Sequence, residues 1–124
     1  MTTVGELNSQ LVKHKIVVIK YGAGFCKPCQ TIKPEFEELK ESRLDIKFIE
    51  IDYNDMNPAL LNDEIFGIKK IPCIKTFIEG TKVCDVIGIN CVVETKKTLD
   101  FEDTARIKAI RMETEHIMPE IDSP

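Results

Sequence analysis

The sequence lacks the features that would direct a chain to a membrane or into secretion. No apolar run approaches the ~20 residues of a transmembrane helix, and the first such run extends only from Ile16 to Ile19. A signal peptide needs ~7–15 apolar residues behind a basic start, and this run is too short for one. We therefore expect no membrane association and a cytoplasmic, reducing location, where structural disulfides do not persist.

An excess of basic residues is also absent. The chain has 17 Lys and Arg against 21 Asp and Glu, which gives a formal net charge of -4. Binding to nucleic acid is driven by clustered basic side chains that neutralise phosphates, so nucleic acid is excluded as the main partner. The sequence contains no internal repeat and no low-complexity tract, and 43% of its residues are hydrophobic. At 124 residues we expect one domain over residues 1–117 and a flexible tail over 118–124.

Cysteine is present in an unusual number for such a chain. Five cysteines are too few and too unevenly spaced for a disulfide-stapled mini-protein, and an odd number leaves at least one unpaired. In a reducing compartment, cysteines are more often catalytic, redox-sensing or metal-bound than structural. The search for a function therefore begins with the chemistry of thiols.

The spacing of apolar residues predicts an α/β domain with the element order αβαβαββα. Helices are predicted over residues 4–12, from near residue 26 onward with Pro34 inside, over 58–64 and over 99–117. Strands are predicted over residues 16–21, 44–51, 73–79 and 82–87, the last two as a hairpin around Gly80-Thr81. The first of these is rich in β-branched residues and the second alternates, so both are expected to be central strands. The expected sheet is a parallel pair with one antiparallel hairpin added.

The strongest motif is Cys26-Lys27-Pro28-Cys29, which directly follows a predicted strand at the first turn of a predicted helix. Free N–H groups and the positive end of the helix dipole favour an anion there, so a thiol ionises more readily than elsewhere. Lys27 adds a further positive charge. The spacer lets the two sulfurs meet across one helical turn. We expect Cys26, nearer the helix end and more exposed, to attack and Cys29 to resolve.

This pair of cysteines predicts thiol–disulfide exchange with no cofactor other than its own disulfide. Cys26 attacks a substrate disulfide, and a mixed disulfide forms. Cys29 then attacks Cys26 and releases the reduced substrate, so that two electrons are transferred.

A second motif, Ile71-Pro72, stands just before the predicted hairpin. Together with the cysteine pair it makes the chain resemble the thioredoxin family over about residues 4–88, with Gly80 and Gly88 also at family positions. The resemblance implies a thioredoxin fold, in which a central mixed sheet is flanked by helices and a cis-Pro72 faces the start of the cysteine helix. It also implies that Ile71, Pro72 and Gly88 bind the substrate segment, with the backbone of Ile71 pairing like an added strand.

By the same resemblance, the chain reduces protein disulfides, serves electron transport and cell redox homeostasis, and is recharged by a NADPH-dependent thioredoxin reductase. Its site nevertheless departs from the family pattern. Lys20 occupies the position of a usually buried acid, Phe25 replaces a tryptophan and Lys27 replaces a glycine. Lys20 could act as a base if burial lowers its pKa, or reach solvent along its aliphatic stem. The family's short first strand is missing, and 36 residues follow Gly88.

Two other functions are compatible with these residues. Cys26 and Cys29 could form a structural zinc site with two of the cysteines at positions 73, 84 and 91, although zinc sites usually bring two closely spaced pairs. Alternatively, the fold could be a binding module that acts through its C-terminal extension.

The remaining cysteines and lysines near these motifs also carry expectations. Cys73 follows Pro72 and is expected to be a buried small hydrophobe rather than a third redox thiol. Cys84 lies in a predicted strand and Cys91 in a predicted loop, so Cys91 is the better candidate for a regulatory or intermolecular disulfide. Lys69-Lys70 is expected to be a solvated turn that borders the substrate groove and could favour acidic partners.

Overall fold

A four-stranded mixed β-sheet forms the centre of the structure, a computed structural model that describes residues 2–122, except for the side chains of 107 and 109–122. The strands are β1 (Ile16–Gly22), β2 (Lys47–Asp52), β3 (Cys73–Ile78) and β4 (Thr81–Ile87), in the order β2-β1-β3-β4. Strand β1 pairs in parallel with β2 and antiparallel with β3, and β3 pairs antiparallel with β4. The predicted parallel pair with an added hairpin is confirmed.

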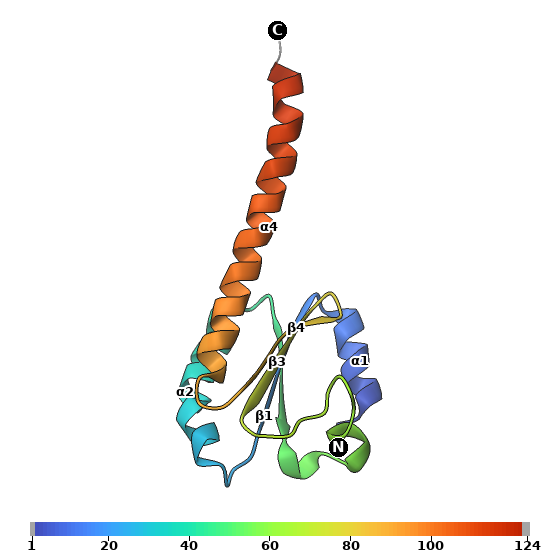
Figure 1. Ribbon diagram of the computed structural model, residues 1–124, viewed down its shortest axis with the longest axis vertical. Coiled ribbons are helices and arrows are strands. Elements are labelled where there is room, and N and C mark those ends of the chain that lie inside the picture. Colours follow the sequence, from blue (N-terminus) through green and yellow to red (C-terminus); the bar gives the residue numbers. More distant parts are fainter. Residues whose placement is uncertain (1, 123–124) are drawn as a thin grey trace.

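Strand β1 is covered on both faces, as its composition predicts. Helices α1 (Val4–Lys13) and α3 (Pro58–Leu61) lie on one side of the sheet, whereas α2 (Lys27–Ser42) and the first turns of α4 (Cys91–Asp122) lie on the other (Figure 1). The Tyr21 hydroxyl donates a 2.8 Å hydrogen bond to the carbonyl of Phe66, which ties the end of β1 to the segment after α3. These contacts hold the carboxyl end of β1, where the cysteine motif begins.

The expectation that β2 is a central strand is wrong, because β2 forms one edge of the sheet. Its apolar residues are nevertheless covered: Ile51 is buried, and Phe48 and Ile49 are half-buried. The apolar residues of a strand indicate which of its faces are covered, because side chains point to the faces of the sheet. They do not indicate whether one or two strands pair with its edges. A sheet edge with both faces packed therefore has the same pattern as a central strand.

Two of the shorter helices differ from the prediction in detail. The apolar spacing in α1 predicts one face with Val4, Leu7, Leu11 and Val12, but Leu7 is buried and Val12 is 88% exposed. Val12 lies five positions after Leu7, which at 3.6 residues per turn places it about 140° around the helix. Helix α3 ends at Leu61 rather than near residue 64, because the Asp63 carboxylate accepts the N–H groups of Ile65 and Phe66 at 3.0 and 2.9 Å and folds the chain into a turn.

The last helix is longer than predicted at both ends. Helix α4 starts at Cys91, because Cys91, Thr95 and Leu99 follow a four-residue spacing and are all buried against the sheet. It continues to Asp122, so residues 118–122 are helical where a flexible tail was expected, and residues 123 and 124 lie outside the described part. Its C-terminal half extends well beyond the rest of the chain (Figure 1). None of the described helices combines the length and apolar character needed to cross a bilayer.

Candidate active site

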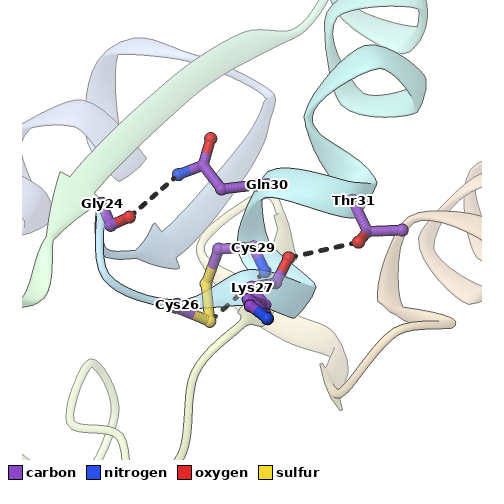
Figure 2. The surroundings of a disulfide bond; sticks show 6 residues. All are labelled: Gly24, Cys26, Lys27, Cys29, Gln30 and Thr31. Atoms are coloured by element: carbon purple, nitrogen blue, oxygen red, sulfur yellow. Dashed lines mark hydrogen bonds between the residues drawn. A yellow bond between two sulfur atoms is a disulfide. The ribbon is translucent and has the colours of Figure 1, made fainter.

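Cys26 and Cys29 are joined by a disulfide at the start of α2, with their Cα atoms 5.2 Å apart. Cys26 is the N-cap of the helix, and its sulfur accepts a 3.3 Å hydrogen bond from the backbone N–H of Cys29 (Figure 2). The predicted pairing across one helical turn is confirmed. A sulfur that already accepts an N–H at a helix N-terminus is placed to be stabilised as a thiolate when the disulfide opens.

The turn between β1 and α2 is shaped around these sulfurs. Gly22 lies directly beside the Cys29 sulfur, since a Cβ added to it would be 3.4 Å from that atom, at the near limit of ordinary van der Waals contact. The N–H of Cys26 donates to the carbonyl of Ala23 at 3.2 Å, and Pro28 occupies the first turn of α2, where its missing N–H is no loss. The Thr31 hydroxyl donates a 3.2 Å hydrogen bond to the Lys27 carbonyl (Figure 2), which stabilises the first turn.

Both cysteines are buried in the oxidised state, and Cys26 is only slightly more exposed than Cys29. Cys26 is 9% exposed and Cys29 is 7% exposed. The two cysteines form one buried cluster with Ala23, and Ile71 packs against this cluster. The exposed part of the site is its rim, where Phe25, Lys27 and Pro28 lie, and Phe25 is 70% exposed.

The Ile71–Pro72 peptide bond is cis, as the resemblance implied. Ile71 contacts the cluster that contains the two cysteines, so this bond lies beside the disulfide. The carbonyl of Pro72 accepts a 2.9 Å hydrogen bond from the N–H of Gly88. Gly88 has a φ of +94°, a region that favours glycine, and it fixes the segment before β3 from the end of β4.

Lys20 has a charged partner that the sequence did not reveal. Its Nζ lies 3.0 Å from Oε1 of Glu50 and 4.7 Å from the centre of the Phe36 ring, with only 12% of its side chain exposed. Burial alone would raise the pKa of Glu50, but hydrogen bonds from Lys40 and Lys20 outweigh it and lower that pKa. Lys20 and Glu50 are register partners in β1 and β2, so correct pairing of these strands would have found the contact.

Two hollows adjoin the disulfide. One is lined by Lys20, Cys29 and Glu50, together with Gly22, Lys33 and Asp55. The other is lined by Phe25, Ile71, Lys69 and Lys70, together with Tyr53 and Ile68. Sequence reasoning missed Tyr53 and Ile68. Tyr53 directly follows β2, and the parallel pairing of β2 with β1 places it near the cysteine motif, which a strand-pairing argument could have found.

The three free cysteines do not join the site. Cys73 packs with Tyr21 and Phe66 on the side of the sheet away from α2, and burial raises its pKa to about 12. This position confirms the expectation of a buried small side chain.

Cys91, expected in a loop as a candidate for a regulatory disulfide, is instead the fully buried first residue of α4, and burial raises its pKa to about 11. Cys84 is half-buried, with the Thr98 hydroxyl 3.3 Å from its sulfur. Among the residues that the structure describes, no three or more His, Cys, Asp or Glu side chains are grouped to hold a metal ion.

Known proteins are similar to this chain in sequence and in architecture. A sequence model of the thioredoxin family matches residues 1–100. The chain is 34% identical to thioredoxin of sheep (Ovis aries) over 76 residues, which cover 61% of this chain and 70% of the sheep protein. It is also 34% identical to chloroplastic thioredoxin F of rice (Oryza sativa subsp. japonica) over 74 residues, 60% of this chain but only 38% of the rice protein. The fold matches the crystal structure of thioredoxin from Trypanosoma brucei brucei with a TM-score of 0.73, at 19% identity, over 84% of this chain and 88% of that chain.

Proposed function

The chain belongs to the thioredoxin family of thiol–disulfide oxidoreductases, and we propose that it reduces disulfide bonds in protein substrates by reversible opening of Cys26–Cys29. The observation that carries this proposal is the disulfide at the N-terminus of α2, packed against Ile71 beside the cis-Pro72 bond. A dithiol in this position can open and close without movement of the sheet, since the sulfurs lie on one helical turn.

The reaction starts from the reduced pair, with Cys26 as the attacking thiolate. Its sulfur attacks one sulfur of the substrate disulfide; an S–S bond forms between Cys26 and the substrate, and the other substrate sulfur leaves as a thiolate and takes a proton. The thiolate of Cys29 then attacks the Cys26 sulfur. This step forms the Cys26–Cys29 disulfide, breaks the S–S bond between Cys26 and the substrate, and releases the second substrate sulfur as a thiolate, which takes a proton from solvent. Two electrons pass to the substrate, and the proton lost by Cys29 passes to solvent through the hollow that Cys29 lines.

The substrate binds at the exposed rim of the site. The backbone of Ile71, before the cis bond, offers hydrogen-bonding groups to an extended substrate segment, and the exposed ring of Phe25 offers an apolar surface. Gly88 contributes by holding Pro72 in place through its N–H.

The oxidised pair needs an electron donor after each turnover. For this role we propose a NADPH-dependent thioredoxin reductase, and no cofactor bound to the chain itself. The three cysteines that remain free favour a reducing compartment such as the cytoplasm.

The test is the precipitation of insulin by dithiothreitol, which follows reduction of the insulin disulfides. The wild-type chain should accelerate precipitation, and Cys26→Ser should abolish the acceleration. Cys29→Ser should accumulate a covalent adduct with insulin, because the resolving thiol is absent. No acceleration by the wild-type chain would overturn the proposal.

A further inference from the structure

Three lysines around the disulfide are exposed and lack an ion-pair partner among the described residues. They are Lys27, between the two cysteines, and Lys69 and Lys70, directly before Ile71-Pro72. The two lysines of the sheet core are, in contrast, neutralised locally: Lys20 by Glu50 at 3.0 Å, and Lys75 by Asp85 at 2.7 Å. The positive charge of the three rim lysines is therefore available to a binding partner.

These lysines approach Cys26 from two different elements. Lys27 comes from the start of α2, where Figure 2 shows it beside the disulfide. Lys69 and Lys70 come from the segment before β3 and line the hollow that also contains Phe25 and Ile71. We call this hollow the lysine groove, and among the described residues none of those that line it is acidic: Phe25, Tyr53, Ile68, Lys69, Lys70 and Ile71.

Acidic side chains lie on the other sides of the site. Asp52 and Asp55 line the hollow that contains Cys29. Asp63 and Glu64 share a second hollow with the two lysines, on the side toward β4, but the Asp63 carboxylate is engaged by the N–H groups of Ile65 and Phe66. The charge around the disulfide is thus directional, positive on the Ile71 side and mixed on the Cys29 side.

The net charge of the chain does not cancel this local charge. Residues 91–122 contain 5 basic and 8 acidic residues, whereas residues 1–88 contain 12 basic and 13 acidic residues. Most of the net negative charge therefore belongs to α4, whose C-terminal half extends away from the β1–α2 turn (Figure 1). Charges separated by more than about 8 Å are largely screened at physiological salt, so a segment in the lysine groove responds to the nearby lysines.

We propose that the lysine groove selects substrate disulfides that are flanked by acidic residues. This inference rests on the proposed disulfide-reducing function. The occupant is an extended segment of the substrate protein, whose cysteine meets Cys26 while an acidic side chain beside it meets Lys69 and Lys70. Phe25 and Ile71 supply the apolar floor, and the lysines supply the charge complementarity that selects among segments.

The experiment compares two peptides that each contain one intramolecular disulfide and differ only in the flanking residues, Asp-Asp in one and Asn-Asn in the other. The wild-type chain at low salt should reduce the Asp peptide with a kcat/KM about threefold to tenfold higher, the range that two exposed charge pairs supply. The double variant Lys69→Glu with Lys70→Glu should reverse this preference. The preference of the wild type for the Asp peptide should be smaller in 0.5 M NaCl, because salt screens the attraction between the lysines and the aspartates.

A matched control changes the same charge at the opposite end of the sheet. Lys13 and Lys47 are exposed, form no ion pair among the described residues and line a separate hollow between α1 and β2. The double variant Lys13→Glu with Lys47→Glu should keep the wild-type preference. The inference is overturned if the wild type reduces insulin but treats both peptides alike, or if the two double variants change the preference equally. Failure to reduce insulin as well as both peptides would overturn the proposed function and the inference together.

Discussion

Lys20 is the residue at which this chain departs most from its family. An ammonium that is largely buried needs a counter-charge, and Glu50 supplies it at 3.0 Å, while the Phe36 ring lies under the cation. Glu50 in turn keeps a second partner in Lys40 at 2.9 Å. A paired lysine is a poor general base. Its positive charge can still favour the thiolate of Cys29, which lines the same hollow.

Lys20→Met tests this role, because methionine keeps the aliphatic stem over Phe36 and removes the charge. We expect the attack of Cys29 on the mixed disulfide to slow by about twofold to tenfold, an effect of the size that one nearby charge has on a thiol pKa. The lifetime of the adduct between Cys26 and a substrate, measured by acid quenching and mass spectrometry, reports this step.

Lys33→Met is the matched control for Lys20→Met. Lys33 is exposed and lines the same hollow. Its substitution therefore removes one positive charge from that hollow and leaves the Lys20–Glu50 pair intact. Its adduct should resolve at nearly the wild-type rate. Equal lifetimes for Lys20→Met and the wild type would show that the ammonium has no part in resolution.

The free cysteines should differ in reactivity according to their burial. Burial raises the pKa of Cys73 to about 12 and that of Cys91 to about 11, so at pH 8 no more than about one in a thousand of either is ionised. Cys84 is only half-buried. After reduction, iodoacetamide at pH 8 should label Cys84 faster than Cys73 and Cys91, as time-resolved peptide mass spectrometry can show. In 6 M guanidinium chloride the three rates should converge, and equal rates in the folded chain would contradict the prediction.

At the scale of elements, the Lys75–Asp85 pair joins β3 to β4. Lys75 has only 6% of its side chain exposed, and its Nζ lies 2.7 Å from Asp85, which also accepts from Lys82 at 2.9 Å. Burial alone would raise the pKa of Asp85, but the hydrogen bonds from the two lysines outweigh it and the pKa is lowered. The hairpin therefore depends on an ionised carboxylate at this position.

Asp85→Asn should lower the free energy of unfolding at pH 7 by about 1–3 kcal/mol, because it leaves the Lys75 charge without its partner. Breaking a fully buried ion pair would cost more, but Asp85 is about one-third exposed and solvent screens its charge. A carboxylate with a lowered folded pKa stabilises above its unfolded pKa, near 4, and loses this contribution as the pH falls.

Urea unfolding at two pH values measures both parts of the Asp85 prediction. The gap between wild type and Asp85→Asn should be present at pH 7 and narrow toward pH 3. Adding Lys75→Met to the variant should recover part of the lost stability, because no buried charge then remains unpaired. A gap of the same size at both pH values would contradict the role of the ionised carboxylate.

The elements also show what the sequence could and could not predict. Cys26 and Cys29 were found because their short motif stands at a predicted helix start, whereas the place of Pro72 beside them came from the resemblance to the thioredoxin family. Their neighbours depend on long-range pairing: the Lys20–Glu50 contact requires the register of β1 and β2. The burial of Cys91 depends on the start of α4, and Asn90, a residue type favoured at N-caps, directly precedes that start; the prediction of a helix from residue 99 missed this signal. The pattern within one segment predicts whether it is a helix or a strand and which of its faces are covered. The contacts between segments follow only from how the segments pair.

At the scale of the whole molecule, the site and the C-terminal half of α4 lie at opposite ends. Figure 1 shows the β1–α2 turn at one end of the chain and the last turns of α4 far beyond the other. Among the described side chains, the last ion pair from α4 to another element is Asp103 with Arg43, at 2.9 Å. Among the described side chains, Leu99 is also the last residue of α4 in the hydrophobic core. The described contacts of α4 with the core and with Arg43 thus all precede residue 108.

Removal of residues 109–124 therefore separates the two functions that the sequence left open, a disulfide reductase and a binding module that acts through its C-terminal extension. A chain that stops after Lys108 keeps Leu99 and the Arg43–Asp103 pair, so we expect it to fold. It should accelerate insulin reduction within about twofold of the full chain, because no group at the disulfide is lost. Insulin precipitation and a thermal unfolding curve for both chains measure this. A folded, shortened chain without activity would place part of the reductase machinery in the extension, and it would contradict a site that is complete in residues 2–108.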